Sequence, residues 1–176
     1  EYAKQALFRL AVAYQGSEDN ANAIRLFKQF VTLYPDDKTV AEAYLSMGAL
    51  VISQVASDSQ PNFEQITLAR ENYGLVRENT ENIALITDSI SNEGGLLERV
   101  ADNPEGLVNF YLTNDKNADD LIDSGEFESI KAKLNNPLYG DLGEFDLSED
   151  SKLDFGELYD LATAISYKEL ENLYKG

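Results

Sequence analysis

Two short stretches in the C-terminal third of the chain place oxygen-bearing side chains at alternating positions. The first runs from Asp115 to Glu126 and reads DKNADDLIDSGE, and the second runs from Asp146 to Glu157 and reads DLSEDSKLDFGE. A tight loop around a sphere turns alternate side chains inward, and carboxylate, amide and hydroxyl oxygens are the ligands of hard cations such as calcium and magnesium. These stretches, named the first loop and the second loop, therefore predict two cation sites.

The side chains that the chain lacks narrow its chemistry further. It contains no Cys and no His. Their absence excludes disulfides, thiolate zinc sites, cysteine nucleophiles, the usual general base and the Ser-His-Asp arrangement. No other group of acids or nucleophiles stands out, so we expect no catalytic residue and no enzyme activity.

The negative charge is concentrated in the part that holds the loops. Residues 1–100 carry 14 acidic and 8 basic side chains, a net of −6, whereas residues 101–176 carry 18 acidic and 6 basic side chains, a net of −12. Phosphate binding needs clustered Lys and Arg, so nucleic acid is excluded as an expected partner. An acidic surface also keeps a protein soluble, but its concentration here favours cation binding.

Both loops resemble the calcium-binding loop of the EF-hand family. In that family, positions 1, 3, 5 and 9 supply side-chain oxygens, position 7 supplies a backbone carbonyl, and a Glu at position 12 supplies two oxygens. The resemblance implies an EF-hand pair that binds two Ca²⁺ ions through Asp115, Asn117, Asp119, Leu121, Asp123, Glu126, Asp146, Ser148, Asp150, Lys152, Asp154 and Glu157. Leu121 and Lys152 would contribute their carbonyls.

The loops also depart from the family pattern. Position 6 is normally Gly because its backbone adopts positive φ, but this chain has Asp120 and Ser151 there. Asp tolerates that conformation better than Ser, so we expect the first loop to bind calcium more tightly. Ser148 is also a weaker, neutral ligand than an Asp would be. Ile122 and Leu153, at position 8 of each loop, are expected to form a short two-stranded contact.

Chance and loss of function offer rival readings of the loops. An acidic chain produces such strings by chance, and an EF-hand can persist without its metal. Two complete loops that begin 31 residues apart, with no ligand position lost, favour real sites. Helices are predicted around them over 104–112, 124–134 and 155–174, with a weaker one within 138–145 that contains two glycines.

The N-terminal third reads as a helix–turn–helix over about 2–14 and 21–34, ended by Pro35. It resembles the tetratricopeptide repeat, whose pattern is matched by Leu7, Leu10, Ala11, Tyr14, Ala23, Phe27 and Pro35. Phe30 departs from that pattern, because the family prefers a small residue there. A looser second unit follows, with matching residues at Tyr44, Met47, Gly48, Val51, Ala69, Tyr73 and Val76.

These patterns predict an all-α protein in two parts. Residues 1–100 form a tetratricopeptide-like scaffold, and residues 101–176 form the EF-hand pair. After the two repeat units, a further helix is predicted over 82–91 and ends at Gly94-Gly95. The longest apolar stretch, around Met47–Val55, is too short to span a membrane. The chain begins with Glu1 inside a helical pattern, so we expect it to be a piece of a longer protein.

The two resemblances together imply a calcium-binding scaffold that holds a protein partner on its repeat surface, with calcium mainly stabilising the helical C-terminal part. Two alternatives stay open: a regulatory or docking module of a larger enzyme, and a structural, calcium-dependent envelope component. The segment 6–48 looks most like repeats of bacterial envelope lipoproteins and periplasmic adaptors. That similarity implies a bacterial protein of the periplasm, cell envelope or extracellular space, with the cytoplasm as the other option.

Overall fold

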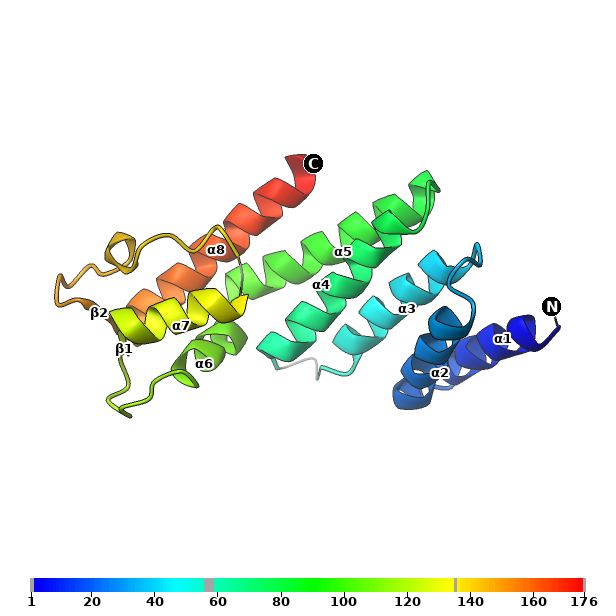
Figure 1. Cartoon of the computed structure of the whole chain (residues 1–176), viewed down its shortest axis with the longest axis horizontal. Coiled ribbons are helices and arrows are strands. Elements are labelled where there is room, and N and C mark those ends of the chain that lie inside the picture. Colours follow the sequence, from blue (N-terminus) through cyan, green and yellow to red (C-terminus); the bar gives the residue numbers. More distant parts are fainter. Residues whose placement is uncertain (1, 56–58, 135, 176) are drawn as a thin grey trace. The chain divides into compact units, whose positions relative to one another are not determined.

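The computed structural model describes residues 2–55, 59–134 and 136–175. Within these ranges the chain forms eight α-helices, one 3-10 helix and a two-stranded sheet (Figure 1). The elements in chain order are α1 (Tyr2–Gly16), α2 (Asn20–Leu33), α3 (Val40–Ser53), α4 (Phe63–Glu78), α5 (Ile83–Asp102), α6 (Glu105–Leu112), β1 (Ile122–Asp123), α7 (Ser124–Leu134), η1 (Leu142–Glu144), β2 (Lys152–Leu153) and α8 (Phe155–Lys175). The predicted all-α class is confirmed.

The chain folds into two compact units, each built from two segments. The first unit comprises residues 1–59 and 64–93, and the second comprises residues 60–63 and 94–176. The helices α4 and α5 each contribute to both units. The predicted division into parts 1–100 and 101–176 stays a prediction.

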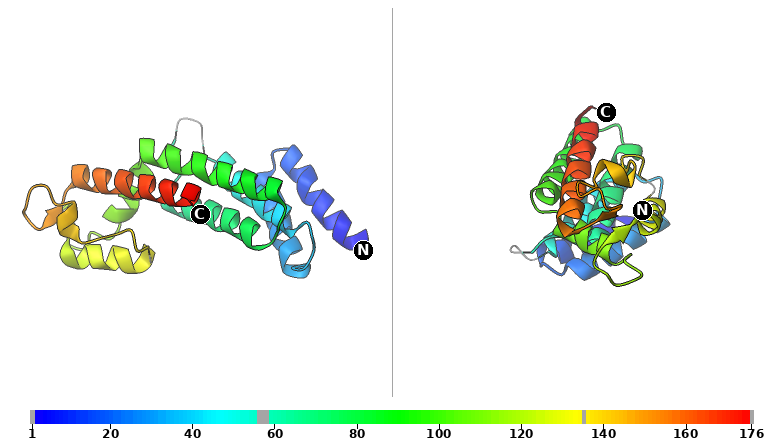
Figure 2. Two further views of the ribbon diagram at one scale, coloured as in Figure 1. Left: turned by 90° about the horizontal axis from the view of Figure 1, so that it is seen from above. Right: turned by 90° about the vertical axis from the view of Figure 1, so that its left-hand side faces the viewer.

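The helices α1 and α2 form an antiparallel hairpin, and both views show them side by side (Figures 1 and 2). Asp19 begins α2 because its carboxylate accepts a hydrogen bond from the backbone N–H of Asn22 at 3.2 Å. The helix ends before Pro35, which cannot continue it. The sequence therefore fixes both boundaries of α2 through local chemistry.

Aromatic rings fill the centre of this hairpin. The ring of Phe8 packs edge-on against Phe27 and Phe30, with centroids 5.5 and 5.2 Å apart. Phe30, the departure from the repeat pattern, is buried and also contacts Tyr34. Leu10 matches the repeat pattern, in which it would face the core, but it is 47% exposed and adds little to the core of the hairpin.

A close approach between α3 and α4 requires a glycine. A Cβ on Gly48 would lie 2.5 Å from Cε1 of Tyr73, closer than two carbon atoms can approach. The ring of Tyr73 is buried. The second helical hairpin therefore packs tightly at the position where the repeat pattern has a small residue.

The helix α5 is longer than the sequence predicted. It runs through Gly94 and Gly95 to Asp102, whereas the glycines were expected to end it. A glycine inside a helix costs only about 1 kcal/mol, and burial of Leu97 and Val100 beyond the glycines favours continuation. At Gly94 a Cβ would lie 2.2 Å from the hydroxyl of Tyr174, so this position marks a close helix contact and not a helix end.

The second unit packs α6, α7 and α8 around a shared core. Its fully buried side chains include Tyr111, Phe127, Ile130, Leu158, Leu161 and Ile165. The hydroxyls of Tyr111 and Tyr139 share a 2.6 Å hydrogen bond inside this core. Burial is the main cause of the strongly raised pKa of Tyr111, so its hydroxyl stays protonated and can take part in this bond.

A four-residue strap, Gln60–Phe63, packs on α6 within the second unit. The rings of Phe63 and Phe110 stack with centroids 3.8 Å apart. A Cβ on Gly106 would lie 2.0 Å from the carbonyl oxygen of Pro61, so only glycine fits beside the strap. Among the described helices, none is long and apolar enough to cross a membrane.

Candidate functional site

The first loop folds around the carboxylate of Asp115. One oxygen of this side chain accepts a hydrogen bond from the backbone N–H of Ala118 at 2.7 Å, and the other accepts from Asp120 at 2.8 Å. Ala118 and Asp120 both adopt left-handed backbone conformations, with φ of 58° and 61°. The acid at position 1 therefore holds a tightly coiled loop.

The second loop repeats this conformation from a different sequence. Asp146 accepts from the backbone N–H of Ser151 at 2.8 Å and from that of Asp150 at 3.3 Å. Glu149 and Ser151, at positions 4 and 6, have φ of 58° and 68°. Both loops thus place position 6 in the left-handed region, although neither has a glycine at that position.

The glutamates at position 12 fold back across their loops. The carboxylate of Glu126 accepts from the backbone N–H groups of Lys116, at 2.7 Å, and Asp123, at 3.1 Å. Glu157 accepts from Leu147 at 2.7 Å, from Ser148 at 2.9 Å and from Asp154 at 3.0 Å. Both carboxylates are buried, so each loop closes on its own last residue.

The aspartates at position 9 begin the two helices that leave the loops. Asp123 accepts from the backbone N–H of Glu126 at 2.9 Å, and Asp154 accepts from that of Glu157 at 2.9 Å. An acidic N-cap also interacts favourably with the helix dipole. This contact orients each position-12 glutamate in the first turn of its helix.

A short antiparallel sheet joins the two loops. Ile122 pairs with Leu153, and Asp123 pairs with Lys152. Both Ile122 and Leu153 are completely buried. The predicted contact between the two position-8 residues is confirmed.

One ion pair also crosses from loop to loop. Nζ of Lys152 lies 2.5 Å from Oδ2 of Asp119. This contact lowers the pKa of Asp119 and raises the pKa of Lys152, because each group stabilises the charged form of the other. Sequence reasoning assigned Lys152 only a carbonyl and missed its ammonium group, because the pair joins residues 33 positions apart.

The flanks of the two loops differ. The first loop lies between α6 and α7, which match the predicted helices 104–112 and 124–134 closely. The second loop leaves through α8 as predicted, but η1 stands in place of the expected helix within 138–145. Glycines at 140 and 143 disfavour a regular helix there.

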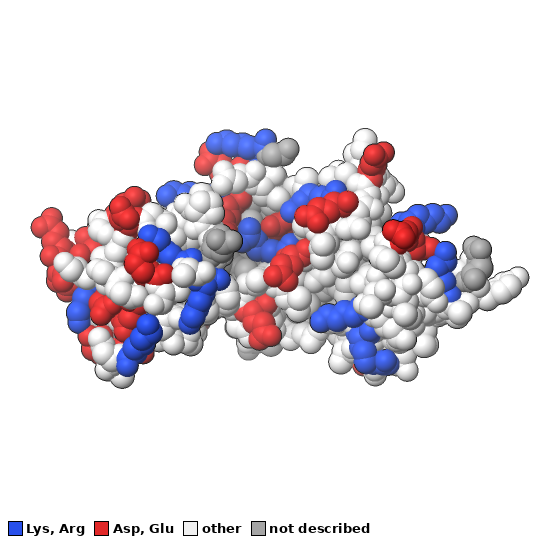
Figure 3. All heavy atoms as spheres, in the orientation of Figure 1, with Lys and Arg blue, Asp and Glu red and all other residues white. Residues whose placement is uncertain are grey.

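The donor set of the loops is made only of oxygen, which fits a hard divalent cation. Within the described residues, no three acidic side chains already converge into a metal-binding cluster. The oxygens of these acidic side chains instead accept the backbone hydrogen bonds described above. The side chains would have to turn inward to hold an ion. Figure 3 shows acidic side chains gathered over the part of the second unit that carries the loops, with basic side chains among them.

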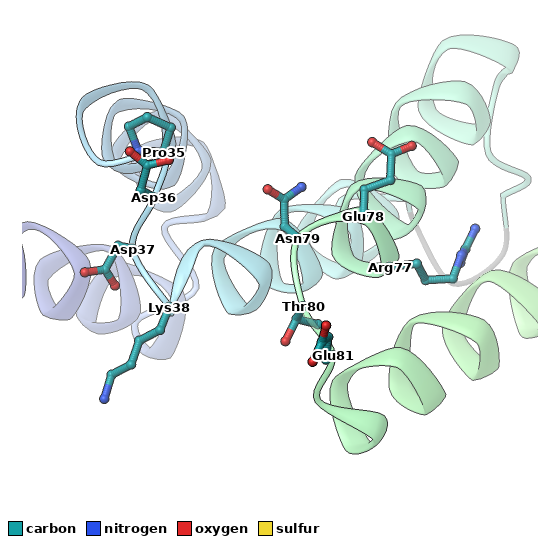
Figure 4. A pocket seen from close by; sticks show the side chains of 9 residues that line it. All are labelled: Pro35, Asp36, Asp37, Lys38, Arg77, Glu78, Asn79, Thr80 and Glu81. Atoms are coloured by element: carbon teal, nitrogen blue, oxygen red, sulfur yellow. The ribbon is translucent and has the colours of Figure 1, made fainter.

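Two of the surface hollows among the described residues lie in the first unit. The larger one, of about 570 Å³, lies between the turn after α2 and the turn after α4. Its side chains point in different directions and include both charges (Figure 4), so they form no convergent site. The smaller one, of about 300 Å³, lies over Phe8 and Phe30 and is edged by Lys4, Arg9 and Lys38.

A buried ion-pair cluster in the first unit was also missed. The carboxylate of Glu93 contacts Nε of Arg70 at 3.1 Å and Nη2 of Arg77 at 2.8 Å. Burial and then the charge of Glu93 raise the pKa of Tyr73 to about 12. The sequence around Glu93 was interpreted as a helix end, which hid its role in joining α4 to α5.

The comparison with protein families places the repeat at the N-terminus. The family model described as Tetratricopeptide repeat matches residues 5–37, which cover most of α1, all of α2 and part of the following turn. No curated protein and no solved structure matches the chain. Residues 5–37 are thus similar to a tetratricopeptide repeat, a module that typically serves in protein interaction.

Proposed function

We propose that the protein is an interaction scaffold whose second unit binds two calcium ions through an EF-hand pair. The observation that carries this proposal is the shared conformation of the two loops. Each has positive φ at positions 4 and 6, a position-12 glutamate folded across the loop, and a position-8 residue in the joining sheet. Different sequences adopt this conformation, which supports a common purpose.

The residues that would hold the ions are those of the resemblance. In the first loop they are the side chains of Asp115, Asn117, Asp119, Asp123 and Glu126 and the carbonyl of Leu121. In the second loop they are the side chains of Asp146, Ser148, Asp150, Asp154 and Glu157 and the carbonyl of Lys152. A bound calcium would supply positive charge that neutralises these repelling carboxylates.

We favour a stabilising role for the ion over a sensing role. A ligand that binds only the folded state stabilises it by about 2.7 kcal/mol at a hundredfold excess over Kd. A sensor exposes an apolar groove that is often rich in Met, but the one Met of the chain, Met47, lies in the first unit. A calcium-dependent rise in the binding of an apolar dye would favour the sensor instead.

The repeat supplies the interaction part of the proposal. A protein partner would contact the surface of the first unit, where the smaller hollow combines an aromatic floor with a charged edge that includes the paired Lys4 and Asp37. The rival role is a docking module of a larger enzyme, which a catalytic domain in the full-length chain would establish. The other rival is a structural envelope component, which calcium-driven oligomerisation in light scattering would favour.

The cellular setting belongs to the same proposal. We place the protein in the periplasm, cell envelope or extracellular space of a bacterium, on the strength of the resemblance of residues 6–48. Extracellular calcium modules work at about 10⁻⁴–10⁻³ M, so an affinity in that range fits this setting. Fractionation of cells that produce the full-length protein tests the location.

The binding proposal is tested by calorimetric titration of calcium into chelator-treated protein. We expect two binding events in the wild type and one in either Glu126→Gln or Glu157→Gln, because the substitution removes a charged oxygen at position 12. Glu128→Gln is the matched control, since Glu128 lies on α7 with an exposed side chain paired to Lys131. Two events should remain in that variant, and no binding at millimolar calcium in the wild type would overturn the proposal.

A further inference from the structure

The ammonium group of Lys152 lies in a field of acidic side chains from both loops. Its nearest partner is Asp119, at 2.5 Å, and Asp123 of the first loop and Asp150 of its own loop also act on its charge. Asp119 occupies position 5 of the first loop, so its carboxylate is one of the proposed calcium ligands. A cation supplied by one loop therefore neutralises a ligand of the other.

The backbone fixes this arrangement. Lys152 belongs to β2 and pairs with Asp123 of β1, which holds the start of its side chain beside the first loop. The carbonyl of the same residue stands at position 7 of the second loop. Lys152 thus contacts the first loop with its ammonium group and belongs to the second loop through its main chain.

We propose that Lys152 is an internal competitor for calcium, which occupies the Asp119 carboxylate of the first loop in the metal-free protein. This inference rests on the proposed calcium function. The Asp119 carboxylate would have to leave the ammonium group of Lys152 to serve as a ligand, so this ion pair would oppose calcium binding at the first loop. Lys152 therefore lowers the calcium affinity of the first loop and acts as a positioning residue for it.

The expected effect is modest, because both side chains are about one-third exposed. Exposed ion pairs change an equilibrium constant by about five-fold at most. We expect Lys152→Met to raise the affinity of the first loop by about two- to fivefold, and we expect added salt to shrink this gain, because salt screens the competing pair.

Lys116 offers a matched control within the first loop. It stands at position 2, and its Nζ lies 3.3 Å from Oγ of Ser129 and contacts no proposed ligand. Lys116→Met removes the same charge without releasing Asp119. Lys152→Arg keeps a cation at the contact and should retain the wild-type affinity.

The experiment is a calcium titration of chelator-treated wild type, Lys152→Met, Lys152→Arg and Lys116→Met at low and high salt, followed by calorimetry. A gain confined to Lys152→Met supports the inference. Equal gains in calcium affinity in Lys152→Met and Lys116→Met would mean that only the overall charge matters, and they overturn the inference. An unchanged affinity in Lys152→Met overturns it as well. In both of those cases the wild type still binds calcium, whereas a wild type that binds none overturns the calcium function together with this inference.

Discussion

The first loop is entered from α6, a helix of eight residues, whereas the second loop is entered from η1, a 3-10 helix of three residues. The loops nevertheless share their left-handed positions, the hydrogen bonds to their first acid and the closing glutamate. The loop conformation therefore depends on contacts among its own twelve residues and on the sheet, and not on a helix before it.

The two loops also differ at position 3. Asn117 accepts a hydrogen bond from the backbone N–H of Asp119 at 3.0 Å through its side-chain oxygen. The hydroxyl of Ser148 instead donates to Asp146 at 3.2 Å. The amide oxygen of the first loop is more basic than the hydroxyl of the second, which is a second physical reason to predict tighter calcium binding at the first loop.

The largest expected effect comes from the sheet that couples the loops. Ile122→Ala removes a completely buried side chain opposite Leu153, and such truncations lower the free energy of unfolding by about 2–5 kcal/mol. If the loops act as a pair, calorimetry should show weaker calcium binding at both of them. Leu147→Ala is the control, because Leu147 is 74% exposed in the second loop, and an unchanged second loop in Ile122→Ala would mean that the loops are independent.

A smaller effect is expected at position 6. Left-handed conformations cost most L-residues about 1–2 kcal/mol, but Asp adopts them more readily than Ser. We therefore expect Ser151→Gly to raise the free energy of unfolding in urea by about 1 kcal/mol, after allowance for the greater entropy of unfolded glycine. Asp120→Gly should gain less, and equal gains in the two variants would contradict this account of the difference.

The smallest effect is expected in the segment before the second loop. Neither glycine there has positive φ, and a Cβ on Gly143 meets no atom within 4 Å. Gly143→Ala should stabilise the protein by about 0.4–1 kcal/mol through the unfolded chain. Gly140→Ala should gain less stability, because its Cβ would lie 2.6 Å from the Glu144 carboxylate. Thermal unfolding of both variants measures the two gains, and the reverse order would contradict this description of the segment around η1.

Local patterns allowed most of these features to be predicted. The α1–α2 hairpin and the pairing of Ile122 with Leu153 follow from residues close in sequence or from regular spacing. The calcium ligands remain a prediction. What could not be predicted depends on distant partners.

The extension of α5 is one such case, since burial beyond Gly95 outweighs the low helix propensity of two glycines. The exposure of Leu10 is another, because helical periodicity gives a face but not what covers it. The Lys152–Asp119 pair and the Glu93 cluster likewise need the folded chain to bring their charges together.

The strap Gln60–Phe63 limits how the second unit can be transferred by recombination into another protein. Its ring stack with Phe110 and its close fit at Gly106 join residues from two separate places in the chain. Recombination that moved residues 101–176 alone into another protein would leave Phe110 without its stacking partner. A transplant that keeps these contacts has to begin before residue 60, and it then carries residues 64–93 of the first unit along. The other route is a fusion that restores the missing segment beside α6.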